Sequence, residues 1–231
     1  MPGFSLLDWV ALAFFAAAWL GYTLAVGMTP AGRRSLNLLM NDQRRAWLEQ
    51  TVVRENRIVD TTINASLQNG TAFFASTSLL AIGGSLTLFR STEDALNVFA
   101  ELPFGLATSR AAWELKVLGL AVIFVYTLFK FGWAYRLFNY AAVLIGAVPP
   151  LKGNDEAQVR AAARRAAAMN VVAATHFNHG QRAFFFALAY LGWFVSGYVF
   201  MAATAAVLLV MWRRQFASDA RRAVVSPEDG P

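Results

Sequence analysis

The stretch that decides the fold class is residues 183–212, AFFFALAYLGWFVSGYVFMAATAAVLLVMW, in which 30 consecutive residues carry no formal charge. A soluble domain has about a quarter of its residues charged, in order to cover its surface. Here only 15% of 231 residues are charged and 57% are hydrophobic. Lipid must therefore be part of the solvent, and we expect one all-α, polytopic membrane domain over residues 1–216.

Three further segments are apolar over the roughly 20 residues that a helix needs to cross a bilayer. With the first stretch they predict four transmembrane helices, at residues 6–28, 71–88, 113–135 and 183–212. Two amphipathic helices are expected on the cytosolic side, at 41–66, running straight into the second span, and at 156–175, with Asp155 as N-cap. The short polar tail, 217–231, is expected to be disordered.

The distribution of basic residues predicts the orientation, because Lys and Arg gather on the cytosolic side of a membrane protein. No Lys or Arg precedes the first span, and many follow the first and third spans. We therefore expect a bacterial inner-membrane protein with its N-terminus outside. Four crossings leave one conflict with this rule. They place the C-terminal segment outside, like the N-terminus, although that segment is basic. The alternative is that part of 131–148 re-enters or crosses the membrane.

Polar and small residues follow two stripes along the second span. The first stripe repeats every seven residues from Arg57, and the second consists of small side chains. The members of the stripes are Asn64, Thr71, Ser78 and Ser85, and Ala72, Ser76 and Gly83. One interpretation is close helix packing, and the other is the lining of a water-filled path between several protomers.

The chain offers few groups for catalysis. It has no cysteine and two histidines, His176 and His179, whose spacing of three allows a shared metal or haem. No carboxylates with matching spacing accompany them, and neither a phosphate-binding glycine loop nor an HExxH or GxSxG motif is present. We therefore expect no catalytic residue, no cofactor and no metal. The two histidines are the residues that would bind a metal if one were present.

A set of polar residues is expected to form one cluster at the inner membrane boundary. Its members are Arg57, Asp60, Asn64, Lys130, Arg136, Asn139, His176, Asn178 and Arg182. Snorkelling of the charged side chains to the interface is the alternative explanation.

Several motifs together resemble the membrane proteins grouped as domain of unknown function 599. They are RENRIVD at 54–60, FFAST at 73–77, FKF at 129–131 and HFN at 176–178, with Gly180 and Trp193. The resemblance covers about 6–218. It implies the fold and an integral membrane location, and no reaction.

Three functions remain open from the sequence. The first is a self-associating, non-enzymatic protein, and one version of this function is a channel or small-solute pathway formed by its protomers. The second is a scaffold or assembly factor that binds lipid or a membrane protein complex, and the third is a redox protein built on His176. The net charge is +6, and the Arg residues that contribute to it cluster beside apolar spans. We therefore expect anionic lipid headgroups as partners and no nucleic acid.

Overall fold

The computed structural model describes residues 3–29, 32–100 and 109–225, which form helices and no strand. The long helices are α1 (Leu6–Met28), α3 (Ile58–Arg90), α5 (Arg110–Gly146), α6 (Glu156–Tyr190) and α8 (Gly197–Phe216). The short ones are α2 (Leu36–Glu49), α4 (Thr92–Ala100), α7 (Gly192–Val195) and α9 (Asp219–Val224), with 3-10 turns at Gly32–Arg34 and Gln50–Val52. Among the described residues, four helices are long and apolar enough to cross a membrane: α1, α3, α5 and the one that begins at Gly197. The all-α polytopic fold is confirmed.

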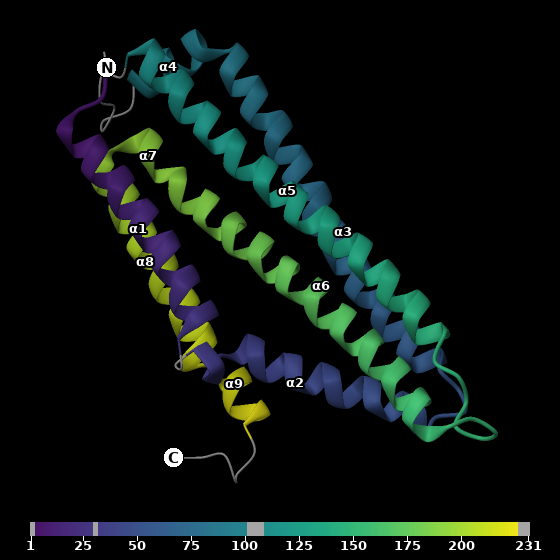
Figure 1. Ribbon diagram of the computed structural model, residues 1–231. Coiled ribbons are helices and arrows are strands. Elements are labelled where there is room, and N and C mark those ends of the chain that lie inside the picture. The colour runs from purple at the N-terminus through teal and green to yellow at the C-terminus, as the bar shows by residue number, and fades with distance from the viewer. Residues whose placement is uncertain (1–2, 30–31, 101–108, 226–231) are drawn as a thin grey trace.

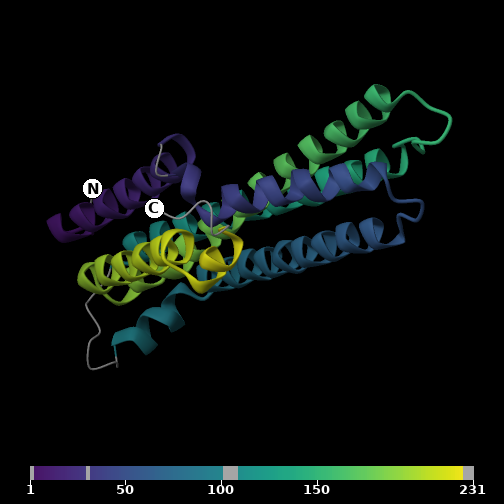
Figure 2. The same cartoon turned by 90° about the horizontal axis from the view of Figure 1, so that it is seen from below.

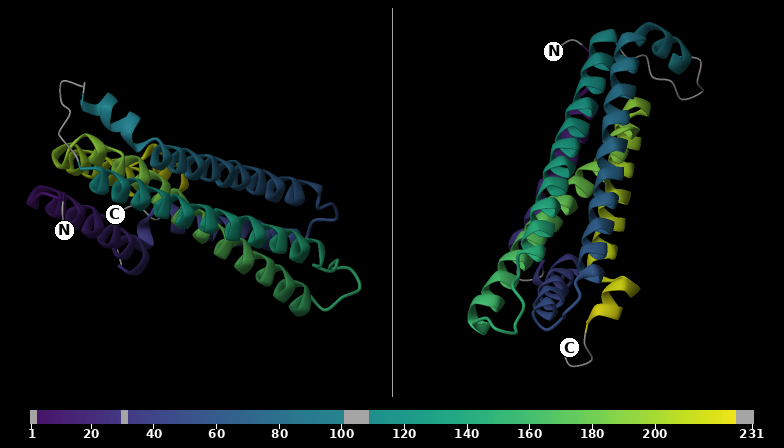
Figure 3. Two further views of the ribbon diagram at one scale, coloured as in Figure 1. Left: turned by 90° about the horizontal axis from the view of Figure 1, so that it is seen from above. Right: turned by 90° about the vertical axis from the view of Figure 1, so that its right-hand side faces the viewer.

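The helices form a row in which each packs on the next. α3 packs on α5, α5 on α6, α6 on α8, and α8 on α1 (Figure 1). α4, α7 and the start of α1 lie at one end, which we call the α7 end, and α2 and α9 lie at the other, the α2 end (Figure 1 and Figure 3). Seen from below, α2 runs from the foot of α1 along α6 toward the far tips of α5 and α6 (Figure 2).

The helices differ in length, and the difference shapes the molecule. α1 and α8, with 23 and 20 residues, are about 30–35 Å long at 1.5 Å per residue, which matches a hydrocarbon core of about 30 Å. α3, α5 and α6 have 33, 37 and 35 residues and reach about 50–55 Å. Their surplus lies at the α2 end. There residues 58–70, 131–146 and 156–177 join α2 in a four-helix unit, the α2-end bundle.

The outer faces of the spanning helices are apolar and uncovered. On α3, the side chains of Phe73 and Leu80 are 67% and 76% exposed, and Leu118 and Val122 of α5 are 52% and 60% exposed. Such large apolar side chains are rarely exposed in continuous bands on soluble proteins. This surface fits contact with lipid.

The expected helix over 41–66 is wrong, because the chain turns between α2 and α3. α2 ends at Glu49, a 3-10 turn follows, and α3 begins at Ile58. The turn brings Trp47 and Arg54 back onto Asp60, whose carboxylate accepts from both. No Gly or Pro marks the turn, so the sequence pattern contains no signal for it.

The boundaries expected for 156–175 and 183–212 are also wrong. α6 begins after Asp155, which is confirmed as its N-cap, and continues without a break to Tyr190. The chain then reverses at 191–196, where Ser196 has extended backbone and its hydroxyl caps α8 by accepting from Val199 N at 3.1 Å. Gly192 permits the reversal, since a Cβ there would lie 3.0 Å from the carbonyl oxygen of Val199. The uncharged stretch is therefore a hairpin instead of one crossing.

This hairpin returns the C-terminal segment to the α2 end. Asn37 N donates to Gln215 Oε1 at 3.2 Å, and Arg221 Nε donates to the carbonyl of Arg34 at 2.8 Å. The expectation that four crossings place the basic tail opposite the loop after α1 is therefore wrong. Residues 131–148 do not re-enter, because α5 continues to Gly146. Part of the tail expected to be disordered forms α9, and 226–231 lie outside the described residues.

An aromatic core holds α1, α6 and α8 together. The ring of Phe15 lies 5.6 Å from that of Phe186 and 5.0 Å from that of Phe200, while Trp19 stacks on Phe186 at 5.3 Å. Such ring pairs add about 0.5–1.5 kcal/mol each beyond the area that they bury. This core aligns α6 with the spanning helices.

Candidate functional site

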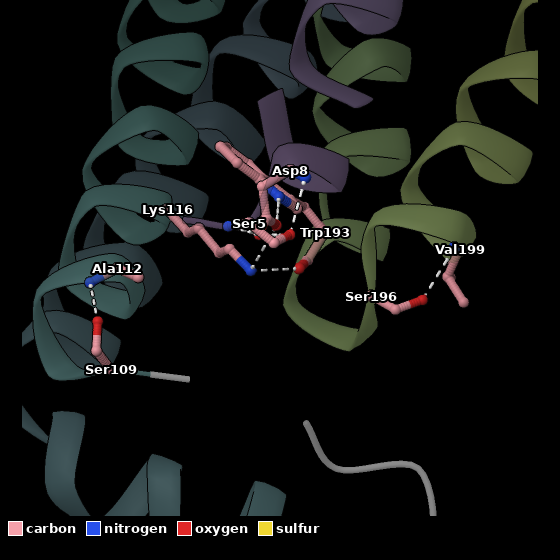
Figure 4. Close-up of polar contacts among 8 residues, drawn as sticks. All are labelled: Ser5, Asp8, Ser109, Ala112, Lys116, Trp193, Ser196 and Val199. Atoms are coloured by element: carbon pink, nitrogen blue, oxygen red, sulfur yellow. Dashed lines mark hydrogen bonds and ion pairs between the residues drawn. The ribbon is translucent and has the colours of Figure 1, made fainter. Parts of the chain in front are cut away.

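A polar network closes the α7 end (Figure 4). Asp8 accepts from Trp193 Nε1 at 2.7 Å and from the hydroxyl and backbone N–H of Ser5, which forms a capping box on α1. Lys116 Nζ donates to the carbonyl oxygen of Trp193 at 2.9 Å and lies 3.7 Å from Asp8 Oδ1. The side chain of Lys116 is buried and does not reach water. Sequence reasoning missed this site, although the Ser5-x-x-Asp8 spacing marked the start of α1.

The expected inner cluster divides into separate groups. In the first, Asp60 is fully buried and accepts from Arg54 Nη1 at 2.5 Å and from Trp47 Nε1 at 2.7 Å. Arg57 donates to the carbonyl oxygens of Val148 and Pro149, beyond the end of α5. These contacts join the α2–α3 turn to the α5–α6 turn at the tip of the α2-end bundle.

A second group runs through the middle of the bundle and touches all four of its helices. Arg44 Nη1 of α2 donates to Asn170 Oδ1 of α6 at 3.1 Å, and Asn170 Nδ2 donates to Asn64 Oδ1 of α3 at 3.2 Å. Asn64 Nδ2 donates to the carbonyl oxygen of Phe138 of α5 at 3.0 Å. Burial lowers the pKa of the Arg44 guanidinium. Buried polar chains of this kind fix the register of the helices that they join. Of the four residues, only Asn64 was among the expected cluster.

The remaining members of the expected cluster lie elsewhere. Asn139 accepts from Gln68 at 2.8 Å, and the exposed Arg136 donates to the hydroxyl of Tyr140 at 2.6 Å. Asn178 lines a small polar pocket between α1, α2, α6 and α8, together with Arg182. Arg182 also lines a different space, between α1 and α5, together with Lys130.

The two histidines lie on α6 with ring centroids 6.4 Å apart. In the described part of the chain, no group of three or more His, Cys, Asp or Glu side chains is placed to hold a metal ion. Tetrahedral zinc sites use three or four such ligands. The donor set therefore does not fit a metal centre at His176 and His179.

The two stripes on α3 have different surroundings. The side chains of the seven-residue stripe, Asn64, Thr71, Ser78 and Ser85, are buried, and each of its three hydroxyls donates to the carbonyl oxygen four residues earlier. Because α5 is the main neighbour of α3, this face belongs to the contact within one chain. On the second stripe, Ser76 and Gly83 are exposed and Ala72 is half-buried.

The fold and these sites define a helical membrane protein with a polar network at each end of its spanning region and a projecting bundle. The model of the family described as "Protein of unknown function, DUF599" matches residues 10–220, and the chain belongs to that family. Comparison with curated proteins and with solved structures found no match.

Proposed function

We propose that the protein is a non-enzymatic membrane scaffold, whose α2-end bundle projects into the cytosol and holds a partner complex at the inner membrane. One observation carries the proposal: α3, α5 and α6, at about 50–55 Å, are longer than a hydrocarbon core of about 30 Å, and a buried polar chain from Arg44 to the Phe138 carbonyl joins them to α2. A rigid surface of this kind suits docking. The positive-inside rule supports the cytosolic side and an N-terminus outside.

The basic face of α6 supports a protein partner more than lipid. Arg164 and Arg165 are exposed, and in the described residues neither belongs to an ion pair. Arg164 is 18 residues from Arg182 along α6, about 27 Å at 1.5 Å per residue. At physiological salt, the interaction between two exposed charges is screened beyond about 8 Å. Lipid headgroups at the level of Arg182 therefore do not account for this face. An acidic surface on a soluble partner is the complement that we propose. Headgroups remain the expected neighbours of Arg213 and Arg214.

The test is charge reversal in the full chain, expressed in cells and cross-linked before purification. We expect Arg164→Glu with Arg165→Glu to remove the co-purifying proteins, as measured by quantitative mass spectrometry. The control is Arg90→Glu with Arg110→Glu, which reverses two charges at the α7 end and should leave them bound. Retention of the same partners by both variants would end the scaffold proposal.

Self-association is a second candidate, and the free face of α3 favours it. α3 packs on α5 along one side only, and the small residues Ser76 and Gly83 are exposed on it, with nothing within 4 Å of a Cβ placed at Gly83. Small residues allow a second helix to approach closely in lipid. We do not extend this proposal to a channel, because the hydroxyl row of α3 is buried.

The oligomeric state in nanodiscs tests self-association. Gly83→Leu should convert a dimer into a monomer, whereas Gly21→Leu, at an equally open glycine of α1, should not. A wild-type protein that is monomeric in nanodiscs would remove this candidate.

A further inference from the structure

A large groove lies between α1 and α5, with α6 behind it. We call it the α1/α5 groove, and its volume is about 1000 Å³. Its walls are mainly apolar and aromatic and include Leu12, Trp19, Gly119 and Val122. Gly119 keeps part of the wall open for the Tyr190 ring, because a Cβ there would lie 2.2 Å from the Tyr190 hydroxyl oxygen.

Positive charge is concentrated at one end of the groove. Lys130 of α5 and Arg182 of α6 line it there together with His179, and both act electrostatically on that imidazole. Among the described residues, no Asp or Glu lines the groove. Lys130 Nζ lies 5.3 Å from the centroid of the Tyr126 ring and has no ion pair in the described part of the chain.

Arg182 is the unusual member of this group. Its side chain is 6% exposed, and its Nε and Nη1 atoms are buried without a hydrogen-bond partner among the described residues. Its guanidinium lies 5.0 Å from the centroid of the Tyr22 ring, which compensates only part of the lost hydration. Buried guanidinium groups are normally paired, because an unpaired buried charge is costly. The vacant donors point to an anionic partner that comes from outside the chain.

We propose that the α1/α5 groove binds one phosphate-headed anionic lipid, with its phosphate at Arg182 and Lys130 and its hydrocarbon tail along the aromatic wall toward the α7 end. The planar guanidinium of Arg182 matches two phosphate oxygens, and the Lys130 ammonium supplies a second positive charge. The two helices that flank the groove, α1 and α5, are long and apolar enough to cross a membrane, so the tail would enter from lipid without crossing water.

The length of the groove agrees with a tail of this kind. Its lining on α1 runs from Trp9 to Thr23, which is 14 helical steps or about 21 Å. One leaflet of a hydrocarbon core about 30 Å thick accounts for about 15 Å, so the groove holds a tail that spans at least one leaflet. The cations lie at the end nearer α2, where the lipid would enter from the cytosolic leaflet. This inference does not depend on the scaffold proposal.

The test is native mass spectrometry of the delipidated full chain in non-ionic detergent, titrated separately with four probes. The probes are dioleoyl phosphatidylglycerol, dioleoyl phosphatidylcholine, oleate and inorganic phosphate. We expect one phosphatidylglycerol per chain, bound at least tenfold more tightly than phosphatidylcholine. Oleate should bind less tightly, and inorganic phosphate should not compete at millimolar concentration.

Paired variants separate this site from the general lipid belt. Lys130→Gln should weaken phosphatidylglycerol binding about tenfold, while Arg136→Gln, on the same helix outside the groove, should not change it. Val122→Trp should block the groove, while Val125→Trp, exposed on α5 but outside the groove lining, should not. Arg182→Lys should keep part of the binding that Arg182→Gln loses, which guards against a variant that fails to fold.

Three results would overturn the proposal. Equal binding of phosphatidylglycerol and phosphatidylcholine, unchanged in Lys130→Gln and Val122→Trp, would show contact with bulk lipid only. Equal binding of oleate would show that a phosphate is not what the site selects. Tight binding of inorganic phosphate alone would show a site for a soluble anion.

Discussion

At the scale of single residues, the α2-end bundle depends on buried amides. Asn64 and Asn170 are 1% and 0% exposed, and their side chains are hydrogen-bonded to each other. Asn170 also accepts from Arg44, and Asn64 also donates to the Phe138 carbonyl. A buried polar group that loses its partner costs about 1–3 kcal/mol. The heptad position of Asn64 was visible in the sequence. Its partner was not, because Asn170 stands in an alanine-rich segment and only the packing of α6 on α3 and α5 brings the two amides together.

Asn170→Ala is therefore expected to destabilise the protein strongly. It leaves Asn64 Oδ1 and Arg44 Nη1 without partners, so the free energy of unfolding should fall by about 1–3 kcal/mol or more. Unfolding in a detergent titration, followed by circular dichroism, measures the loss. Gln68→Ala, which breaks a half-buried bond to Asn139, is the control and should cost less than about 1 kcal/mol. Equal losses in the two variants would contradict the role of the buried chain.

Gly180 is a second residue on which packing depends. A Cβ at this position would lie 2.8 Å from Cε1 of Phe131, whose side chain is fully buried and has little room to move. Gly180→Ala should lower the midpoint of thermal unfolding, with a loss of about 1–3 kcal/mol that is typical of overpacking. Gly132→Ala, where nothing lies within 4 Å, should be neutral or slightly stabilising, since alanine favours a helix. A neutral Gly180→Ala would mean that α5 and α6 pack less closely than described.

At the scale of elements, periodicity and hydropathy predicted which segments are helical, and they failed where helices begin, end and reverse. The turn at 50–57 contains no Gly or Pro, and it forms because Asp60 binds Trp47 and Arg54. The reversal at 191–196 lies inside an uncharged stretch, where a hydropathy profile shows no boundary between two helices. Gly192, Ser196 and Gly197 were the available signals. The expected topology and the family resemblance likewise suggested one inner cluster, although α5 and α6 are long enough to separate its members into several groups.

The turn between α2 and α3 provides a test at this scale. Asp60→Ala removes the acceptor of both Trp47 and Arg54, so we expect a loss of about 1–3 kcal/mol in the free energy of unfolding and faster proteolysis at residues 50–57. Limited trypsin digestion, which cleaves after Arg54 and Arg57, reads out the opening of the turn. Asp42→Ala, which breaks only an exposed pair with Arg45, should stay within about 0.5 kcal/mol. Unchanged cleavage in Asp60→Ala would contradict this role of Asp60.

At the scale of the whole molecule, α6 lies beside the spanning helices although its hydropathy does not place it among them. It carries Arg182 and two histidines, yet it runs from the α2 end to the α7 end beside the spanning helices and is covered by α5 and α8. Polar residues are tolerated at membrane depth when they face protein or a cavity. Counting α6, the chain passes five times between the two ends. An odd number of passes puts the basic residues 213–222 on the same side as those after α1, which removes the conflict with the positive-inside rule.

The most direct measurement of this arrangement is the accessibility of single cysteines, which the cysteine-free chain allows without other changes. Asp94→Cys, Asn154→Cys and Asp219→Cys lie at exposed positions of α4, of the α5–α6 turn and of α9. In intact cells, a membrane-impermeant maleimide should label Asp94→Cys only, and the other two should react only after the membrane is permeabilised. If Asp219→Cys and Asp94→Cys were both labelled in intact cells while Asn154→Cys was not, the chain would cross the membrane four times. That result would contradict the five-pass arrangement.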